Sequence, residues 1–168
     1  MNNKMLMAAL GACAITAAAV PANAQSTTPT GLSLKLGVFW PTDSATRDAT
    51  SDTWFDVGLE YRLKDMPVTN EDMKSHLSIS LDWATHSDVR IMPVMLNYVM
   101  DQRQTYWMIG AGAAFVHGSG SDDTRFAYQL GLGYNFQQGP TPAFVEARYI
   151  GTSESSEAGM VFAVGVRF

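Results

Sequence analysis

The sequence predicts an all-β fold: a closed, eight-stranded, antiparallel up-and-down transmembrane β-barrel that follows a cleaved signal peptide. Three observations support this expectation. The chain begins with a basic and apolar segment of the kind that directs export. The remainder alternates apolar and polar residues over eight segments, which is the periodicity of strands. One face of nearly every segment is apolar, whereas the opposite face is small, polar or charged, as in a barrel surrounded by lipid.

The N-terminal segment has the three parts of a secretory signal peptide. Lys4 supplies a positive charge, an apolar run covers residues 5–20, and Ala22-Asn23-Ala24 forms a small-x-small cleavage site. The run is too short and too rich in alanine to be a good membrane-spanning helix. We therefore expect cleavage directly after the last of these alanines.

The domain organisation follows from this cleavage site. We expect residues 1–24 to be the signal peptide and residues 25–168 to form one outer-membrane β-barrel domain. An alternative stays open, because residues 10–13 (LGAC) resemble the lipobox of bacterial lipoproteins, which would make Cys13 a lipidation site. Cys13 is also the only cysteine, so we expect no disulfide bond in the mature chain.

Charge and histidine spacing exclude several classes of protein. Lys4 is the only charged residue of the signal peptide, so ten basic and sixteen acidic residues remain in the mature chain. Such a chain has no broad basic surface, and we expect no nucleic-acid partner. His76, His86 and His117 lack the spacing of metal ligands, so we expect neither a metal nor another cofactor.

Each predicted strand is about ten residues long, which is the length of a tilted strand that spans a membrane. Connectors rich in Gly, Pro, Asp and Ser separate the strands. In the first strand, Leu32, Leu34 and Leu36 share one face, and Ser33 and Lys35 share the other. The predicted strands are 31–40, 53–63, 75–84, 89–100, 105–117, 125–136, 143–150 and 159–168.

The same alternation assigns an outward face to every other strand. The fifth strand is the richest in small residues, and the sixth has the clearest alternation. The residues expected to face outward from the second to the eighth strand include Val57 and Leu59, Ile79 and Leu81, Val94 and Leu96, Ile109 and Ala111, Leu130 and Leu132, Val145 and Ala147, and Val164 and Val166.

Two places depart from regular alternation. Pro93 lies inside the fourth strand and cannot donate a ladder hydrogen bond, so we expect a bulge or a strand end there. The connector over residues 64–74 is long for a periplasmic turn, which leaves the neighbouring strand boundaries open.

The charges on the inward face favour a membrane barrel over a soluble one. Nine charges on one face would make a poor soluble core, but they suit the lumen of a barrel in lipid. We expect a closed barrel because the backbone N–H and C=O groups of an open strand edge would have no hydrogen-bond partners in hydrocarbon. The inward charges are Lys35, Asp56, Glu60, Arg62, Asp82, Arg125, Glu146, Arg148 and Arg167.

Aromatic residues fall into two belts when both termini are placed in the periplasm. Such belts mark the two interfaces of a membrane. The outer belt contains Trp40, Phe55, Trp83, Phe115 and Tyr149, and the periplasmic belt contains Tyr61, Tyr98, Trp107, Tyr134, Phe136 and Phe168.

Three segments carry a resemblance to a known family. Residues 126–134 (FAYQLGLGY), 144–149 (FVEARY) and 164–168 (VGVRF) resemble the last three strands of OmpA-like and OmpW-like outer-membrane β-barrels. The resemblance implies a bacterial outer-membrane protein. It also implies that Phe168 is the aromatic assembly signal presented to the barrel-assembly machinery. The short loops depart from the long-looped adhesive relatives, and no peptidoglycan-binding domain is expected.

The inward charges are the candidate functional site. An eight-stranded lumen is filled by side chains or holds one small ligand. We expect a salt-bridge network that plugs the lumen, with an ion or small-solute path as the alternative. The predicted lumen charge network consists of Lys35, Asp56, Glu60, Arg62, Asp82, Glu146, Arg148 and Arg167.

Three classes of function remain open, because a fold does not decide among them. The leading interpretation is a structural or surface-interaction protein that supports envelope integrity. The alternatives are a porin-like narrow pore or small-solute transporter, and a membrane-embedded lipid enzyme. We expect no enzyme and assign no catalytic residue, since the His-Ser-Asn run of lipid A deacylases is absent. The expected partners are outer-membrane lipid and lipopolysaccharide, and the barrel is expected to be a monomer.

Overall fold

A computed structural model of the chain describes residues 30–68, 72–87, 89–118, 121–136 and 142–168. The expected signal peptide, residues 1–24, lies outside the described residues, as does the alternative lipidation site at Cys13.

The chain consists almost entirely of strands. In chain order the elements are β1 (Leu32–Pro41), α2 (Ser44–Ala49), β2 (Trp54–Met66), β3 (Met73–His86), β4 (Val89–Gln102), β5 (Thr105–Gly118), β6 (Ser121–Phe136), β7 (Ala143–Thr152), η1 (Ser155–Glu157) and β8 (Gly159–Arg167). Neither helix is long and apolar enough to cross a membrane, and the same is true of any helix in the described part of the chain.

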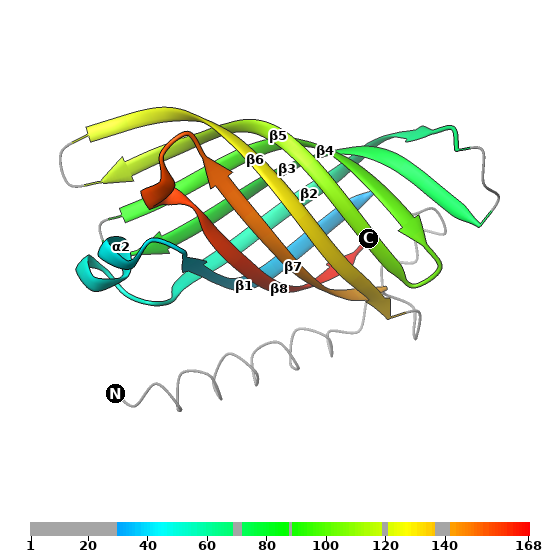
Figure 1. Cartoon of the computed structure of the whole chain (residues 1–168). Helices are drawn as coiled ribbons and strands as arrows, with labels where there is room; N and C mark the ends of the chain where they lie inside the picture. The colour runs from blue at the N-terminus through cyan, green and yellow to red at the C-terminus, as the bar shows by residue number, and fades with distance from the viewer. Residues whose placement is uncertain (1–29, 69–71, 88, 119–120, 137–141) are drawn as a thin grey trace.

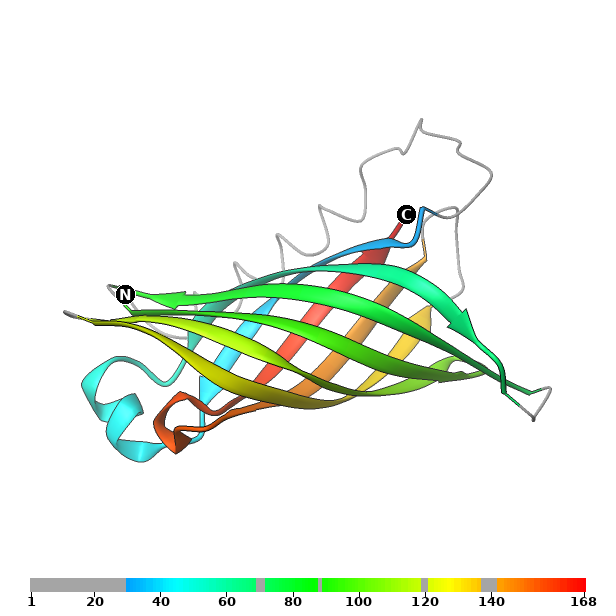
Figure 2. The same cartoon turned by 90° about the horizontal axis from the view of Figure 1, so that it is seen from above.

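The eight strands form one closed antiparallel barrel, in which each strand pairs with its neighbours in sequence. β8 returns to β1 and closes the sheet, with Ser33 opposite Arg167 and Pro41 opposite Gly159. Figures 1 and 2 show the barrel from two sides. We call the end that carries α2 and η1 the α2 end, and the end near residues 30 and 168 the terminal end. The predicted closed eight-stranded barrel is confirmed.

Strand boundaries differ from the prediction mainly where strands are polar. β2 continues to Met66 and β3 starts at Met73, which shortens the long connector to residues 67–72. β6 starts at Ser121, because the polar residues Asp122 to Thr124 pair with the end of β5. Alternation of apolar and polar residues predicts a strand only where one face is apolar, so it does not predict the parts of a strand that are polar on both faces.

Pro93 does not produce the expected bulge or strand end. β4 runs through it, and Pro93 is buried opposite Ala114 of β5. On its other side, pairing with β3 is interrupted between Ile91 and Val94, but the register is the same before and after the gap. The missing proline N–H is therefore accommodated by a local break in the ladder. A register shift of the kind that a bulge produces occurs instead between Arg62 and Lys64 on β2, in its pairing with β3.

The lumen contains three layers of buried side chains. Nearest the α2 end is an apolar cluster that includes Phe39, Trp54, Ile91, Met95, Ile150 and Val161. The middle layer is charged and is described below. Nearer the terminal end, a second apolar cluster consists of Val99, Tyr106, Met108 and Phe144. Only small residues allow such large rings inside a narrow barrel, and a Cβ at Gly133 would collide with the ring of Tyr106.

A short helix at the α2 end was not expected from the sequence. Asp43 caps α2, and its Oδ2 accepts hydrogen bonds from the Thr46 backbone N–H (2.7 Å) and hydroxyl (2.9 Å). Arg47 donates from Nη1 to the carbonyls of Pro41 (2.9 Å) and Thr42 (2.8 Å). These bonds hold α2 against the end of β1, beside the η1 connection.

Candidate functional site

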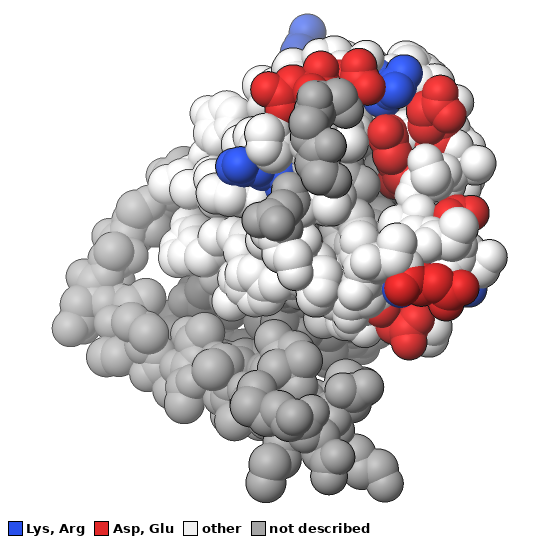
Figure 3. Space-filling model, turned by 90° about the vertical axis from the view of Figure 1, so that its left-hand side faces the viewer, with Lys and Arg blue, Asp and Glu red and all other residues white. Residues whose placement is uncertain are grey.

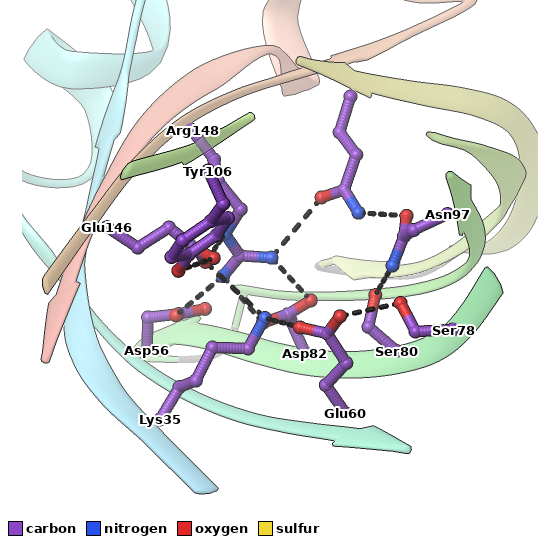
Figure 4. A network of polar contacts seen from close by, with 11 residues as sticks. Lys35, Asp56, Glu60, Ser78, Ser80, Asp82, Asn97, Tyr106, Glu146 and Arg148 are labelled. Carbon is purple, nitrogen blue, oxygen red and sulfur yellow. Dashed lines mark hydrogen bonds and ion pairs between the residues drawn. The ribbon is translucent and has the colours of Figure 1, made fainter. Parts of the chain in front are cut away.

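The middle layer of the lumen brings together six of the predicted charges. Figure 4 shows them pointing toward one another from different walls of the barrel. We call this set the charge belt: Lys35 of β1, Asp56 and Glu60 of β2, Asp82 of β3, and Glu146 and Arg148 of β7.

Arg148 is the centre of the charge belt. Its Nη1 and Nη2 donate to Asp82 Oδ2 and Oδ1 across the lumen at 2.9 and 2.7 Å, a bidentate pair. Its Nε lies 2.7 Å from Glu146 Oε1, and its Nη2 lies 3.7 Å from Asp56 Oδ2. Nη1 also donates to Gln129 Oε1 at 3.2 Å. One guanidinium thus connects strands on opposite sides of the barrel.

Lys35 is the second cation of the belt. Its Nζ donates to Glu60 Oε2 at 2.9 Å and to Glu146 Oε1 at 3.4 Å. The other oxygens of these two carboxylates also accept hydrogen bonds: Ser78 Oγ donates to Glu60 at 2.6 Å, and Tyr106 OH donates to Glu146 at 2.7 Å. Both glutamates are therefore fixed by neutral donors as well as by a cation.

A neutral chain extends the belt around the lumen. Gln129 Nε2 donates to Asn97 Oδ1, and Asn97 Nδ2 donates to Ser80 Oγ at 3.0 Å. All three side chains are buried. A buried polar network in which each member has a partner holds its side chains in one arrangement.

The centre of the belt is sealed from solvent, whereas Glu60 keeps 12% of its side-chain surface exposed and borders a cavity at the terminal end. Lys35, Asp56, Asp82 and Arg148 each have 0% of their surface exposed. Side chains that lined a continuous aqueous channel would retain surface accessible to water. The buried centre of the belt therefore plugs the lumen, and its chemistry is limited to exchanging ion-pair partners or protons.

Two predicted members lie outside the belt. Arg62 is exposed and pairs with Asp65, with Nη2 2.6 Å from Oδ1, next to the register shift of β2. Arg167 places its guanidinium 5.0 and 4.9 Å from the ring centroids of Tyr106 and Phe144. Stacking on aromatic rings satisfies a cation without a carboxylate.

Sequence reasoning did not assign several residues that complete the site. The alternation along each strand does place four neutral side chains on the inward face, namely Ser78, Ser80, Asn97 and Gln129. Alternation alone does not identify which group each of them contacts. Tyr106 also has a signal, since it alternates with the outward Trp107. Its bond to Glu146 joins β5 to β7 and depends on the tertiary arrangement.

Phe168 lies at the terminal end and is exposed. Its backbone N–H donates to the carbonyl of Leu32 at 2.8 Å, and its carbonyl accepts from Gly31 N at 3.1 Å. A cavity of about 460 Å³ at this end is lined by residues that include Ser33, Glu60, Arg62, Lys64, His76 and Arg167.

The α2 end is predominantly acidic, as Figure 3 shows. Arg125 lies there, with Nη2 2.9 Å from Asp123 and Nε 3.8 Å from Glu157. His117 pairs with Asp122. The bond from the Thr46 backbone N–H holds the pKa of Asp43 below its ordinary value. No cluster of three or more His, Cys, Asp or Glu side chains suited to a metal occurs among the described residues.

Comparisons with known proteins identify the fold and no family. No family model matches the sequence, and no curated protein matches it. The structure is similar to the outer membrane protein Ail of Yersinia pestis, with 16% identity, a TM-score of 0.47, and coverage of 82% of this chain and 98% of that one. It is also similar to the outer membrane enzyme PagL, with 13% identity, a TM-score of 0.51, and coverage of 81% and 98%. The second likeness supports the eight-stranded barrel fold.

Proposed function

We propose that this chain is a bacterial outer-membrane β-barrel protein that does not conduct and that has a structural or surface-interaction role in the envelope. The membrane placement is supported by the outer surface, where every strand exposes large apolar side chains. An apolar surface this extensive would not be stable in water. Examples, one from each strand in order, are Leu34, Leu59, Leu81, Leu96, Ile109, Leu132, Val145 and Phe162.

The buried centre of the charge belt is the observation that carries the non-conducting role. Four of its side chains have no exposed surface, and an apolar cluster closes the lumen between the belt and the α2 end. Ions crossing this path would have to displace the paired charges and the buried rings of Phe39 and Trp54. The geometry therefore supports a plugged barrel over a narrow pore or a small-solute transporter.

The α2 end supports a role at the surface. With both termini in the periplasm, this end faces outward, and its connections carry several exposed acidic side chains. Acidic groups there would meet lipopolysaccharide through bridging cations. We propose no catalytic role: the described histidine nearest to an acid at this end, His117, is exposed at a hairpin tip with Asp122.

Membrane placement is tested by cell fractionation and by gel mobility with and without boiling. We expect the protein in the outer-membrane fraction, with faster migration before boiling because a closed barrel resists detergent in the cold. Recovery as a soluble periplasmic monomer would contradict the membrane placement.

Conduction is tested by recording from the purified barrel in planar bilayers. We expect silence from the wild type. The comparison is Arg148→Ser, which removes the central side chain of the belt and should produce current events if the barrel still shows the folded gel mobility. Sustained conductance of the wild type would contradict the proposal that the lumen is plugged.

Assembly by the barrel-assembly machinery is proposed to depend on Phe168. Phe168→Ala should lower the amount of assembled barrel without changing export, because the aromatic side chain would be the recognised feature. Phe136→Ala, an exposed aromatic at the same end, is the matched control. Equal outer-membrane levels for Phe168→Ala and wild type would remove this role from Phe168.

A further inference from the structure

The charges of the belt do not balance. Four carboxyl groups, those of Asp56, Glu60, Asp82 and Glu146, face two cations, Lys35 and Arg148. The other arginines of the predicted network do not compensate, since Arg62 is paired at the surface and Arg167 stacks on aromatic rings. If every group is ionised, a largely buried layer of the lumen holds two uncompensated negative charges. Burial of unpaired charge is strongly unfavourable.

Asp56 differs from the other three carboxyls. Asp82 receives a bidentate pair from Arg148, Glu60 receives Lys35 and Ser78, and Glu146 receives Lys35 and Tyr106. Both carboxyl oxygens of Asp56 are buried without a hydrogen-bond donor among the described residues. Its nearest cation is Arg148 at 3.7 Å, and that guanidinium is already engaged by Asp82 and Glu146. The excess charge is therefore least compensated at Asp56.

A proton fits this position better than a metal ion. Hard cations require several oxygen ligands, and no cluster of three metal-ligating side chains occurs in the described part of the lumen. A cation at Asp56 would also be repelled by Arg148 nearby. A proton removes the charge of the carboxylate and adds none to its surroundings.

We propose that Asp56 is a proton-binding site, a neutral carboxylic acid inside the closed barrel at neutral pH. The charged groups that face it are Lys35 from β1, Asp82 from β3, and Glu146 and Arg148 from β7. Release breaks the O–H bond of the Asp56 carboxyl and passes the proton to water, which leaves a carboxylate beside Asp82. The like charges then compete for Arg148, and the belt loosens as the pH rises.

The test is infrared spectroscopy of the barrel in phosphatidylcholine vesicles. At neutral pH the wild type should show the carbonyl stretch of a buried protonated carboxyl, and Asp56→Asn should lose that band. Asp65→Asn, an exposed aspartate at the terminal end, is the spectral control and should keep it. Absence of the band from the wild type, or its persistence in Asp56→Asn, would overturn the proposal.

Stability provides a second readout. Because asparagine resembles the neutral acid, Asp56→Asn should fold. It should match the wild type in its urea midpoint below the ordinary aspartate pKa and should exceed it at neutral pH, where the unfolded aspartate is ionised. The wild-type midpoint should fall as the pH rises, since the folded state then holds a proton that the unfolded state has released, and Asp56→Asn should lack this fall. A variant that fails to fold, or a wild-type midpoint that depends on sodium concentration instead of pH, would contradict the proton site.

Discussion

The lumen is filled in two different ways in neighbouring layers. Toward the α2 end, residues such as Trp54, Ile91 and Ile150 form a dry apolar cluster. In the middle, Arg148 and its partners form the charge belt. Burial of a large apolar side chain stabilises by about 1.5–3 kcal/mol, whereas buried ions must first be desolvated. The apolar layer therefore stabilises the barrel, and the belt fixes which arrangement of the lumen is stable.

The largest expected loss of stability comes from removing the central cation of the belt, which leaves the apolar layer unchanged. Arg148→Gln leaves Asp82 buried without a cation and Glu146 with Lys35 alone, so we expect a loss of about 3–5 kcal/mol in unfolding free energy. Urea titration followed by gel mobility measures it. Arg125→Gln, whose ion pairs at the α2 end are partly exposed, should change stability by no more than about 1 kcal/mol.

The same experiment has a stricter form. Adding Asp82→Asn to Arg148→Gln should cost less than the sum of the two single changes, because the second change removes the charge that the first left unpaired. Strict additivity would mean that these side chains do not share a network.

A smaller effect is expected where a ring packs on a glycine. Gly133→Ala places a Cβ against the ring of Tyr106, whose hydroxyl holds Glu146. We expect a loss of about 1–3 kcal/mol from overpacking. Gly118→Ala is the matched control, since a Cβ there has no atom of the described residues within 4 Å. Equal stability of the two variants would show that Tyr106 moves freely.

The apolar layer should respond only to lost volume. Ile150→Val removes one buried methylene and should cost about 0.5–1.5 kcal/mol in the same urea assay. Ile109→Val makes the identical change on the outer face, where Ile109 is exposed, and should cost less. A larger loss at the outer position would reverse the assignment of the two faces.

The smallest effect concerns the cap of α2. The lowered pKa of Asp43 means that its capping bond to Thr46 is fully present above the ordinary aspartate pKa and is lost as the pH falls through the lowered folded value. Asp43→Ala should remove this acid transition. The Thr46 amide resonance, followed by NMR during acid titration, measures it, and an unchanged titration in Asp43→Ala would assign the transition elsewhere. The barrel itself should remain folded in both proteins.

Strand periodicity was sufficient to predict most of the architecture. Side chains alternate between two faces, so Lys35, Asp82 and Arg148 could be placed on the inward face from their apolar neighbours alone. The number of strands and the closed barrel followed from the same pattern. The helix α2 was not predicted from the pattern, because its six residues are too few to show a periodicity. One cap and the hydrogen bonds of Arg47 hold it in place.

The sequence by itself therefore determined which side of the barrel wall each residue occupies, since parity is a local property of one strand. Only the tertiary structure decided which inward residues meet. Asp82 and Arg148 lie on opposite walls, and their contact depends on the register accumulated around the whole barrel. The register shift beside Arg62 and the aromatic rings beneath Arg167 separate both arginines from the belt. The exact alignment of inward residues along the barrel axis depends on all strand pairings together, so position within one strand does not decide which of them meet.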